Sequence, residues 1–201
     1  IQGPKAEELM VRVFGETIRN VRFFRFGVYQ FQGRDLVIAR SGYSKQGGFE
    51  IYLEGSELGM PLWHKLFEAG EDLKVRAGCP NLIERIEGGL LSYGNDMTDD
   101  NTPHECGLGR FCNTHTAIGC IGRDALLRVA REGPVRQIRP IAIDGDPVPP
   151  CDRFWPVFAS GKPVGRVSSA AWSPDFRTCL CFMVRIRIRD TPQLYSNLKT
   201  K

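Results

Sequence analysis

The chain changes in character beyond its middle, and this change restricts the fold more than any single motif does. After residue 134, prolines recur between short apolar runs, as around 138–143, 163–168 and 179–188. Proline cannot donate a backbone hydrogen bond, so within sheets it is confined to edge strands, strand starts and bulges, and this punctuation is typical of short strands. We therefore predict a β-rich second part, with a boundary near residue 117 that separates domains 1–116 and 117–201.

The first part of the chain mixes helical and extended patterns. Between Pro4 and Gly15, apolar residues recur at helical spacing, which predicts a helix. The other predicted elements are strands over 21–31, 36–40 and 49–54, a helix over 56–69 capped by Ser56, a helix over 81–91, and a short helix over 123–131. Gly88 and Gly89, inside the helix over 81–91, indicate close packing against a neighbouring element.

The segment 49–54 alternates strictly between apolar and polar residues, and it follows a glycine-rich polar loop over 41–48. The alternation places Glu50 and Tyr52 side by side on one face of a strand. A carboxylate can accept two parallel hydrogen bonds from an amino-pyrimidine edge, and a neighbouring tyrosine can stack on a flat heterocycle. The same pattern also describes the solvated face of a half-buried strand, and spacing alone favours that interpretation.

Arg85 lies beside the apolar stripe of the helix predicted over 81–91. A guanidinium in this position could clamp the carboxylate of an anionic ligand. An ion pair within the helix, or between packed elements, explains the same placement, and without further context it is the favoured interpretation. The sequence pattern alone leaves both readings open.

The composition excludes several classes of function. A net charge of +4, from 27 Lys and Arg against 23 Asp and Glu, is too small to indicate nucleic-acid binding. No apolar run approaches the length needed to span a bilayer, so no membrane partner is expected. Seven cysteines form no Cys-x-x-Cys pair and only three histidines accompany them, so no metal site is expected. Reduced thiols, and hence a cytoplasmic location, are favoured, and Cys179 and Cys181 are expected to pack on one face of a strand.

Several short segments occur in a characteristic order: Ile1–Lys5, Ala39–Tyr43, Gly48–Tyr52, Arg85–Leu90, Tyr93–Asp96, Thr102–Leu108 and Gly165–Ser169. In this order they resemble the folate-dependent aminomethyltransferase superfamily, which is typified by the glycine-cleavage T-protein. Within it, residues 78–87 and 91–96 are similar to the dimethylsulfoniopropionate demethylases, a branch that moves a methyl group from a sulfonium to tetrahydrofolate. The loop Ser44–Gly48 replaces the Thr-Gly-Glu-Asp-Gly type of loop expected in the glycine-cleavage enzyme.

The resemblance implies tetrahydrofolate as cofactor and a small sulfonium zwitterion as substrate. Glu50 matches the family's pterin-binding glutamate, and Tyr52 and Tyr43 match positions that line the folate. Arg85 matches an arginine that meets the anionic part of the folate. The family's N-terminal region would precede Ile1, so we expect a fragment that is inactive alone and whose catalytic residues lie partly upstream.

The resemblance also implies an α+β fold, in which an incomplete antiparallel-sheet α/β folate-binding domain is followed by a small C-terminal β-barrel. The expected reaction yields 3-(methylthio)propanoate and 5-methyltetrahydrofolate. Two alternatives stand beside it: a glycine-cleavage aminomethyltransferase that acts on a lipoyl-bound aminomethyl group, and a folate-binding homologue without turnover. The oligomeric state is open, with a homodimer as one option.

Overall fold

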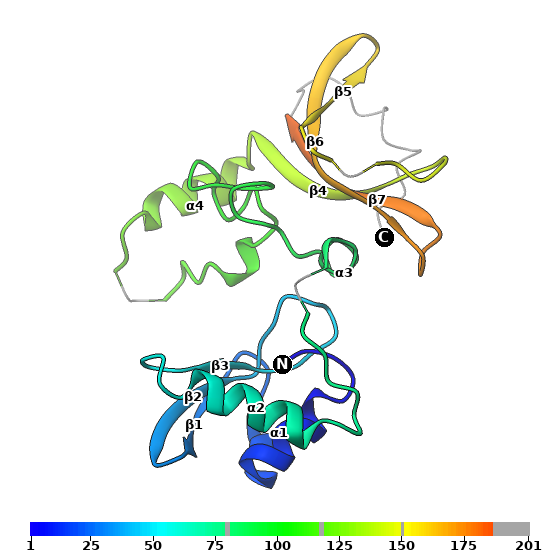
Figure 1. The fold of residues 1–201 in the computed structure, drawn as a ribbon. Helices are drawn as coiled ribbons and strands as arrows, with labels where there is room; N and C mark the ends of the chain where they lie inside the picture. Colours follow the sequence, from blue (N-terminus) through cyan, green and yellow to red (C-terminus); the bar gives the residue numbers. More distant parts are fainter. Residues whose placement is uncertain (79–80, 117–118, 150, 187–201) are drawn as a thin grey trace. The chain divides into compact units, whose positions relative to one another are not determined.

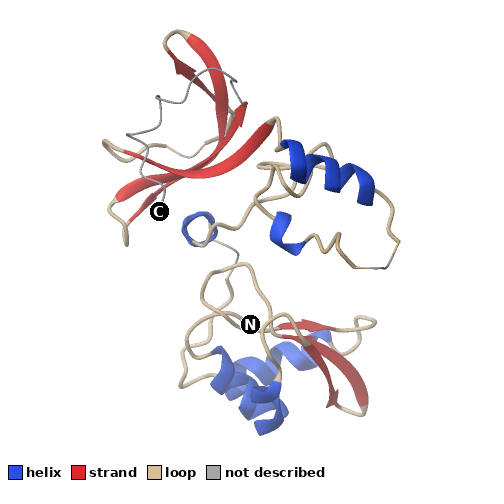
Figure 2. Ribbon diagram, turned by 180° about the vertical axis from the view of Figure 1, so that it is seen from behind, coloured by secondary structure: helices blue, strands red, loops and turns tan. Residues whose placement is uncertain are grey.

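The computed structural model describes residues 1–78, 81–116, 119–149 and 151–186 (Figure 1). The chain forms two compact units, Ile1–Glu84 and Arg85–Lys201. The division into units falls before Arg85, whereas the sequence predicted a domain boundary near residue 117. Each unit contains one antiparallel sheet together with helices, as the colours of Figure 2 show. The predicted combination of helices with antiparallel sheets is therefore confirmed.

The first unit combines a small sheet with two helices and one 3-10 helix. In chain order its elements are α1 (Ala6–Phe14), η1 (Glu16–Asn20), β1 (Phe26–Phe31), β2 (Arg34–Ala39), β3 (Glu50–Tyr52) and α2 (Gly59–Ala69). The three strands lie in the order β1-β2-β3, and both strand pairs are antiparallel. The apolar side chains of α1 and α2 pack on one face of this sheet and form the core of the unit.

Helix α1 matches its prediction, because Leu9 and Met10 are buried and the helix ends at Gly15, which has a φ of 86°. Helix α2 begins later than predicted. Its N-cap residue is Leu58 rather than Ser56, and Ser56 contributes only its carbonyl oxygen, which accepts a hydrogen bond of 3.0 Å from the nitrogen of Gly59. The proposed side-chain cap at Ser56 is therefore wrong.

The strand predicted over 21–31 is shortened to β1, because the chain turns before Phe26. Phe24 has a φ of 57°, which no strand residue adopts, and its nitrogen donates a hydrogen bond of 2.9 Å to the carbonyl oxygen of Arg40. High β-propensity in this aromatic segment thus does not produce an extended backbone. The tertiary contact with the end of β2 determines where the strand starts.

The second unit contains a four-stranded antiparallel sheet in the order β4-β7-β6-β5. Helix α3 (Leu82–Glu87) crosses the division between the units. The further elements of the second unit are the 3-10 helix η2 (Gly109–Phe111), α4 (Arg123–Glu132), β4 (Arg136–Ile143), β5 (Trp155–Ala159), β6 (Lys162–Ser173) and β7 (Thr178–Ile186). Three of the four strands and α4 were predicted. Cys179 and Cys181 are both buried in this unit, as expected.

Two features of the second unit differ from the prediction. Helix α3 ends at Glu87, and Gly89 has a φ of 72° with no atom within 4 Å of an added Cβ, so this glycine turns the chain and does not serve close packing. Strand β5 was not predicted. It contains Pro156 and lies at the edge of the sheet, where a missing backbone N–H is tolerated.

Some predictions fall on residues that the structure does not describe. These are Cys79 and Pro80 within the family-like segment and the end of the strand predicted over 179–188. In the described ranges, no helix combines the length and the apolar character needed to cross a bilayer.

Candidate functional site

The loop before β3 is held against the start of the chain. The nitrogen of Ile1 donates to the carbonyl oxygen of Phe49 (2.7 Å), and the nitrogen of Phe49 donates back to the carbonyl oxygen of Ile1 (2.8 Å). Gly48 sits inside this bridge with a φ of 151°, and a Cβ atom there would overlap the carbonyl oxygen of Ile1. Only glycine permits this close approach, which joins the loop to the start of the chain shortly before β3 begins.

Glu50 and Tyr52 both lie on the outer face of the sheet, as the alternation predicted. The register pairs Glu50 with Ala39 and Tyr52 with Val37 on the neighbouring strand. Both side chains are exposed, Tyr52 to 56%. The Glu50 carboxylate accepts a hydrogen bond from the Ser41 hydroxyl. Since a carboxylate has about four lone-pair sites, acceptor capacity remains for the donors of an amino-pyrimidine.

The same outer face continues as an apolar surface onto β1. Val28 lies directly opposite Val37, which in turn lies opposite Tyr52, so the three form one row across the sheet. Phe26 lies opposite Ala39, which lies opposite Glu50, so these three form a second row across the sheet. The exposed fractions of Phe26 and Val28 are 69% and 58%, so the face that carries Glu50 also carries exposed apolar side chains.

Tyr43 lies in the loop over 41–48 and is half-buried. Its neighbour Ser44 is buried and donates a hydrogen bond of 2.7 Å to the side-chain oxygen of Gln2, while the amide of Gln2 donates to the carbonyl oxygen of Ser41 (3.0 Å). These contacts fix the loop that carries Tyr43 to the segment that precedes α1.

Arg85 belongs to the second unit and is 6% exposed. Its Nη1 atom donates to the Asp96 carboxylate (2.8 Å) and to the carbonyl oxygen of Leu90 (3.1 Å). Its Nη2 atom donates to the hydroxyl of Ser169 (2.6 Å), and its guanidinium carbon lies 5.9 Å from the centre of the Phe182 ring. The ion-pair interpretation of Arg85 is thus realised, with Asp96 as the partner.

Asp96 accepts four hydrogen bonds although its side chain is fully buried. One carboxylate oxygen accepts from Arg85 and from the backbone nitrogen of Ser92 (2.8 Å). The other accepts from the hydroxyl groups of Ser168 (2.6 Å) and Ser169 (2.5 Å). A buried charge is tolerated only when it is paired and hydrogen-bonded, and this carboxylate is saturated.

A β-bulge brings both serine hydroxyl groups to the same carboxylate. Successive residues of a regular strand point to opposite faces, so Ser168 and Ser169 could not both reach Asp96. The register between β6 and β7 shifts between Val167 and Ser169, which makes Ser168 the extra residue. The bulge re-aims its side chain toward the same side as that of Ser169.

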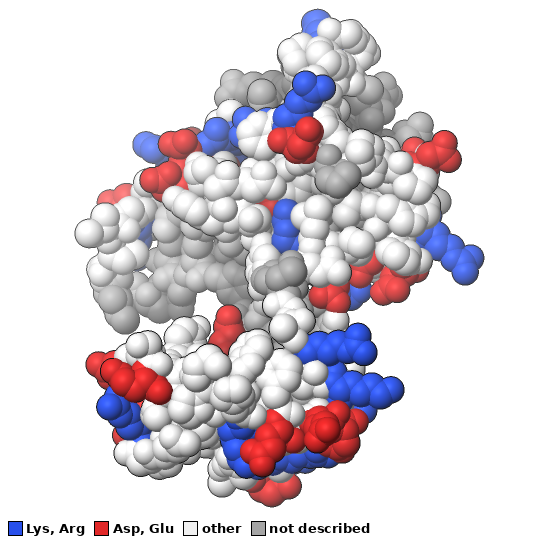
Figure 3. Space-filling model, in the orientation of Figure 1, with Lys and Arg blue, Asp and Glu red and all other residues white. Residues whose placement is uncertain are grey.

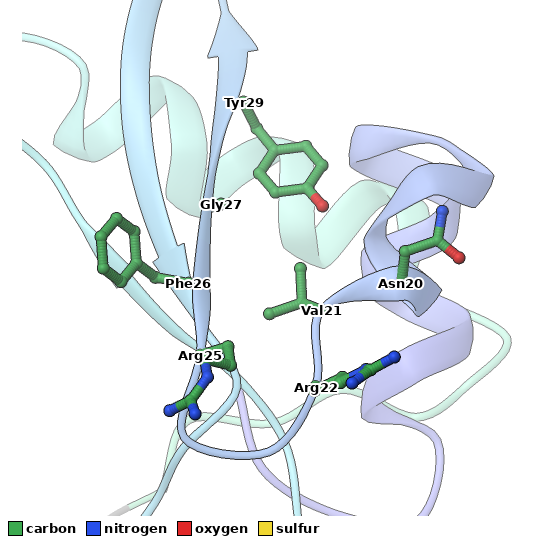
Figure 4. A pocket seen from close by; sticks show the side chains of 7 residues that line it. All are labelled: Asn20, Val21, Arg22, Arg25, Phe26, Gly27 and Tyr29. Atoms are coloured by element: carbon green, nitrogen blue, oxygen red, sulfur yellow. The ribbon is translucent and has the colours of Figure 1, made fainter.

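A cavity of about 300 Å³ lies beside β1 in the first unit (Figure 4). One wall comes from β1 with Gly27 and Tyr29, and the other from the segment over 20–22. Arg22 and Arg25 give this cavity a basic rim. None of the predicted folate residues of the first unit lines it, so we do not assign the cavity to the predicted site.

Several surface charges of the first unit are paired. On the face shown in Figure 3, acidic and basic side chains are interspersed over this unit. Arg19 and Arg40 both pair with Glu7, at 2.5 and 2.7 Å, and Arg12 pairs with Asp72 and with Glu8. These pairs place opposite charges next to one another on the surface of the first unit.

Comparison with known proteins identifies the relatives of the chain. Residues 1–116 match the family model of the GCVT N-terminal domain, which is more than half of the chain. The chain belongs to this family. The resemblance to the aminomethyltransferase superfamily is therefore confirmed.

Two curated relatives and one solved structure resemble the chain over most of its length. Dimethylsulfoniopropionate demethylase DmdA from Ruegeria pomeroyi is 62% identical over 176 residues, which are 88% of this chain and 48% of that protein. An aminomethyltransferase from Caldanaerobacter subterraneus is 34% identical over 181 residues, 88% of this chain and 47% of that protein. The crystal structure of the glycine cleavage system aminomethyltransferase T from Bartonella henselae superimposes with a TM-score of 0.72, at 26% identity, and covers 92% of this chain and 50% of that one. The chain thus spans about half the length of each of these relatives.

Sequence reasoning located the outer face of β3 and singled out Arg85, but it missed the residues that hold Arg85. Asp96, Ser168 and Ser169 lie in segments that carry the family resemblance, yet nothing in their spacing announced a contact. One available signal was Arg85 itself, since a guanidinium beside an apolar stripe requires a buried carboxylate partner.

Proposed function

We propose that the chain contributes the folate-binding part of a tetrahydrofolate-dependent methyltransferase that demethylates dimethylsulfoniopropionate. The observation that carries this proposal is the exposed pair Glu50 and Tyr52 on an apolar sheet face, in a chain 62% identical to a dimethylsulfoniopropionate demethylase. An aminomethyltransferase is less well supported, since the corresponding identity is 34%.

In this proposal Glu50 accepts two hydrogen bonds from the amino-pyrimidine edge of the pterin. Tyr52, one row further along the strand, lies against the pterin plane, and Tyr43 lines the same ligand from the loop before β3. Arg85 meets the anionic part of the folate. The apolar side chains on the same face support this role, because they offer a flat ring system a surface to pack on beside the carboxylate.

The chemistry needs orientation more than acid or base catalysis. The methyl carbon leaves the sulfonium sulfur, which keeps the bonding electron pair and becomes a neutral thioether. The carbon bonds to N5 of tetrahydrofolate, which loses its proton to solvent. Holding the three atoms in line converts a bimolecular encounter into an intramolecular step, and this chain's part is to fix the position of the pterin.

We further propose that the four-stranded sheet of the second unit is the described part of the expected C-terminal β-barrel, with residues 117–201 as its domain. Six described cysteines are free thiols, which supports a reducing compartment such as the cytoplasm.

The test uses the intact natural polypeptide, offered tetrahydrofolate with dimethylsulfoniopropionate or with an aminomethylated lipoyl carrier. We expect 3-(methylthio)propanoate and 5-methyltetrahydrofolate from the first donor. Turnover with the lipoyl donor and not with dimethylsulfoniopropionate would show instead that the protein is an aminomethyltransferase. Binding of folate without turnover of either donor would leave a non-catalytic homologue.

The role of Glu50 is tested with Glu50→Gln and the matched variant Glu54→Gln. Glu54 is exposed and lies four residues after Glu50, two residues beyond the end of β3, so it controls for the loss of one negative charge. Loss of a charge-assisted bidentate contact is expected to weaken tetrahydrofolate binding by about tenfold or more in Glu50→Gln, with no change in Glu54→Gln. Equal affinities in the two variants would remove Glu50 from the site.

A further inference from the structure

Strand β1 forms one edge of the sheet in the first unit, and alternate backbone groups of this strand face away from β2. The nitrogen of Arg40 donates to the carbonyl oxygen of Arg25 (2.9 Å), so these two residues are a hydrogen-bonded pair. Such pairs recur at every second residue of an antiparallel ladder, so the N–H and C=O groups of Phe26, Val28 and Gln30 point away from β2. In the ranges that the structure describes, no strand other than β2 pairs with β1, and these groups form a free edge.

The cavity of about 300 Å³ borders this free edge. Among the described residues, β1 and the segment over 20–25 line the cavity, and β2 does not. Figure 4 shows Val21 and Tyr29 directed into the space between β1 and that segment, whereas Phe26 points away from it. The edge of β1 is therefore bordered by a cavity and not by a packed element.

Two exposed arginines form the rim of this cavity. The nitrogen of Arg25 donates to the carbonyl oxygen of Arg22 (2.9 Å), and the resulting turn brings both residues to the rim. Four other arginines of the first unit each pair with a carboxylate, namely Arg12, Arg19, Arg34 and Arg40. Within the described residues, neither Arg22 nor Arg25 has an acidic partner. The two positive charges at the rim therefore favour an acidic partner from outside.

The two faces of the sheet define which side chains an added strand would need. Residues that lie directly opposite one another in antiparallel strands share a face. Every second side chain of an added strand would therefore lie beside the exposed side chains of Phe26 and Val28, where apolar groups fit. The side chains between them would lie on the cavity side, with Arg25 and Tyr29, where acidic groups fit.

We propose that the free edge of β1 and the adjoining cavity bind an extended acidic segment of another protein. The segment adds to the three-stranded sheet antiparallel to β1, its apolar side chains cover Phe26 and Val28, and its carboxylates pair with Arg22 and Arg25. In this mode of recognition the main-chain hydrogen bonds give affinity, and the sites for alternate side chains give specificity. The inference is independent of the proposed function, because it requires neither Glu50 nor a folate.

The test uses the intact natural polypeptide and a blocked six-residue peptide of alternating valine and glutamate, which equals β1 in length. The fluorescence anisotropy of a dye on the peptide measures binding, and hydrogen exchange reports the amides of Phe26, Val28 and Gln30. We expect these amides to gain protection when the peptide binds. A peptide with lysine in place of glutamate is expected not to bind, and equal binding of the two peptides would reject the role of the arginines.

Two N-methylated peptides separate strand addition from simple attraction between charges. In an antiparallel arrangement, the valines opposite Phe26 and Val28 exchange hydrogen bonds with them, whereas the N–H groups of the glutamates point away from β1. Methylation of the valine nitrogens is therefore expected to abolish binding, and methylation of the glutamate nitrogens to leave it unchanged. Equal affinities of the two methylated peptides would overturn the inference.

The variants Arg22→Gln and Arg25→Gln each remove one charge from the rim, and Arg34→Gln is the matched control. Arg34 is exposed and lies on β2, outside the cavity, so its replacement changes the net charge equally. The dissociation constant of the valine-glutamate peptide is expected to rise about fivefold in each rim variant and to stay unchanged in the control. Equal effects in all three variants would overturn the inference. Protection of the Phe26 and Val28 amides without peptide would also overturn it, because a second copy or another part of the natural polypeptide would then cover the edge.

Discussion

Replacement of Gly48 by alanine tests whether the bridge between the start of the chain and the loop before β3 determines where Glu50 lies. Gly48 has a φ of 151°, and an added Cβ would overlap the carbonyl oxygen of Ile1 and lie 2.9 Å from the Cα atom of Gln2. Both neighbours are backbone atoms, which cannot rotate away. The neighbouring Gly47 provides a matched control, since its φ is 77° and no atom lies within 4 Å of its added Cβ.

The expected destabilisation differs between the two variants. In Gly47→Ala only the left-handed backbone is penalised, by about 1–2 kcal/mol. In Gly48→Ala the overlap also separates the two segments, so the reciprocal bonds between Ile1 and Phe49 and the bond from the nitrogen of Gly3 to Gly47 are lost. Three hydrogen bonds at about 0.5–1.5 kcal/mol each, added to the backbone penalty, bring the total to about 2.5–6.5 kcal/mol.

Two measurements check this difference. Urea unfolding reports the free energy of unfolding of each variant, and hydrogen exchange reports the amides of Gly3 and Phe49, which donate across the bridge. Both amides are expected to lose protection in Gly48→Ala and to keep most of it in Gly47→Ala. Equal destabilisation of the two variants, with protection retained at Phe49, would refute the assignment of the close approach to Gly48.

Three further predictions follow from single groups. Asp96→Ala leaves the buried guanidinium of Arg85 without its charged partner, so we expect urea titrations to show a free energy of unfolding lower by about 3–5 kcal/mol. A loss under about 1 kcal/mol would show that water replaces the carboxylate. Burial raises the pKa of Cys181 to about 12, so iodoacetamide at pH 8 should label the exposed Cys120 and reach Cys181 only after unfolding. Labelling of both cysteines in the folded protein would contradict the burial of Cys181. Hydrogen bonds from Arg40, and then from Arg19, lower the pKa of Glu7, so its stabilisation is present at neutral pH and lost as the pH falls through the lowered pKa. Glu7→Gln should therefore destabilise the protein at pH 7 and much less at pH 3, and an effect independent of pH would exclude this linkage.

Much of the fold was predictable because its elements carry strong local patterns. The alternation over 49–54 predicted which side chains of β3 share a face, and apolar spacing with a terminal glycine predicted α1. The errors arose where a tertiary contact overrode a local preference. The aromatic segment before Phe26 turns because it bonds to the end of β2, and β5 includes a proline because an edge strand tolerates one.

The candidate site was predictable to a smaller extent. The position of Glu50 and Tyr52 on one face follows from the period of an extended chain, which is a local property. The partners of Arg85 do not follow from any local period, because Asp96 lies 11 residues away and Ser169 lies 84 residues away along the chain. Contacts at such separations depend on how strands and loops pack, and no sequence period encodes them.

Local chemistry in the linear chain thus established the helices, most of the strands, the shared face of Glu50 and Tyr52, and membership of a family. The folded molecule added the register that places Val37 and Val28 on the same face as Glu50, and the bulge that turns two consecutive serines toward one carboxylate. The physical reason is that a backbone period acts over a few residues, whereas the burial of a charge is satisfied only by groups that the whole fold brings together.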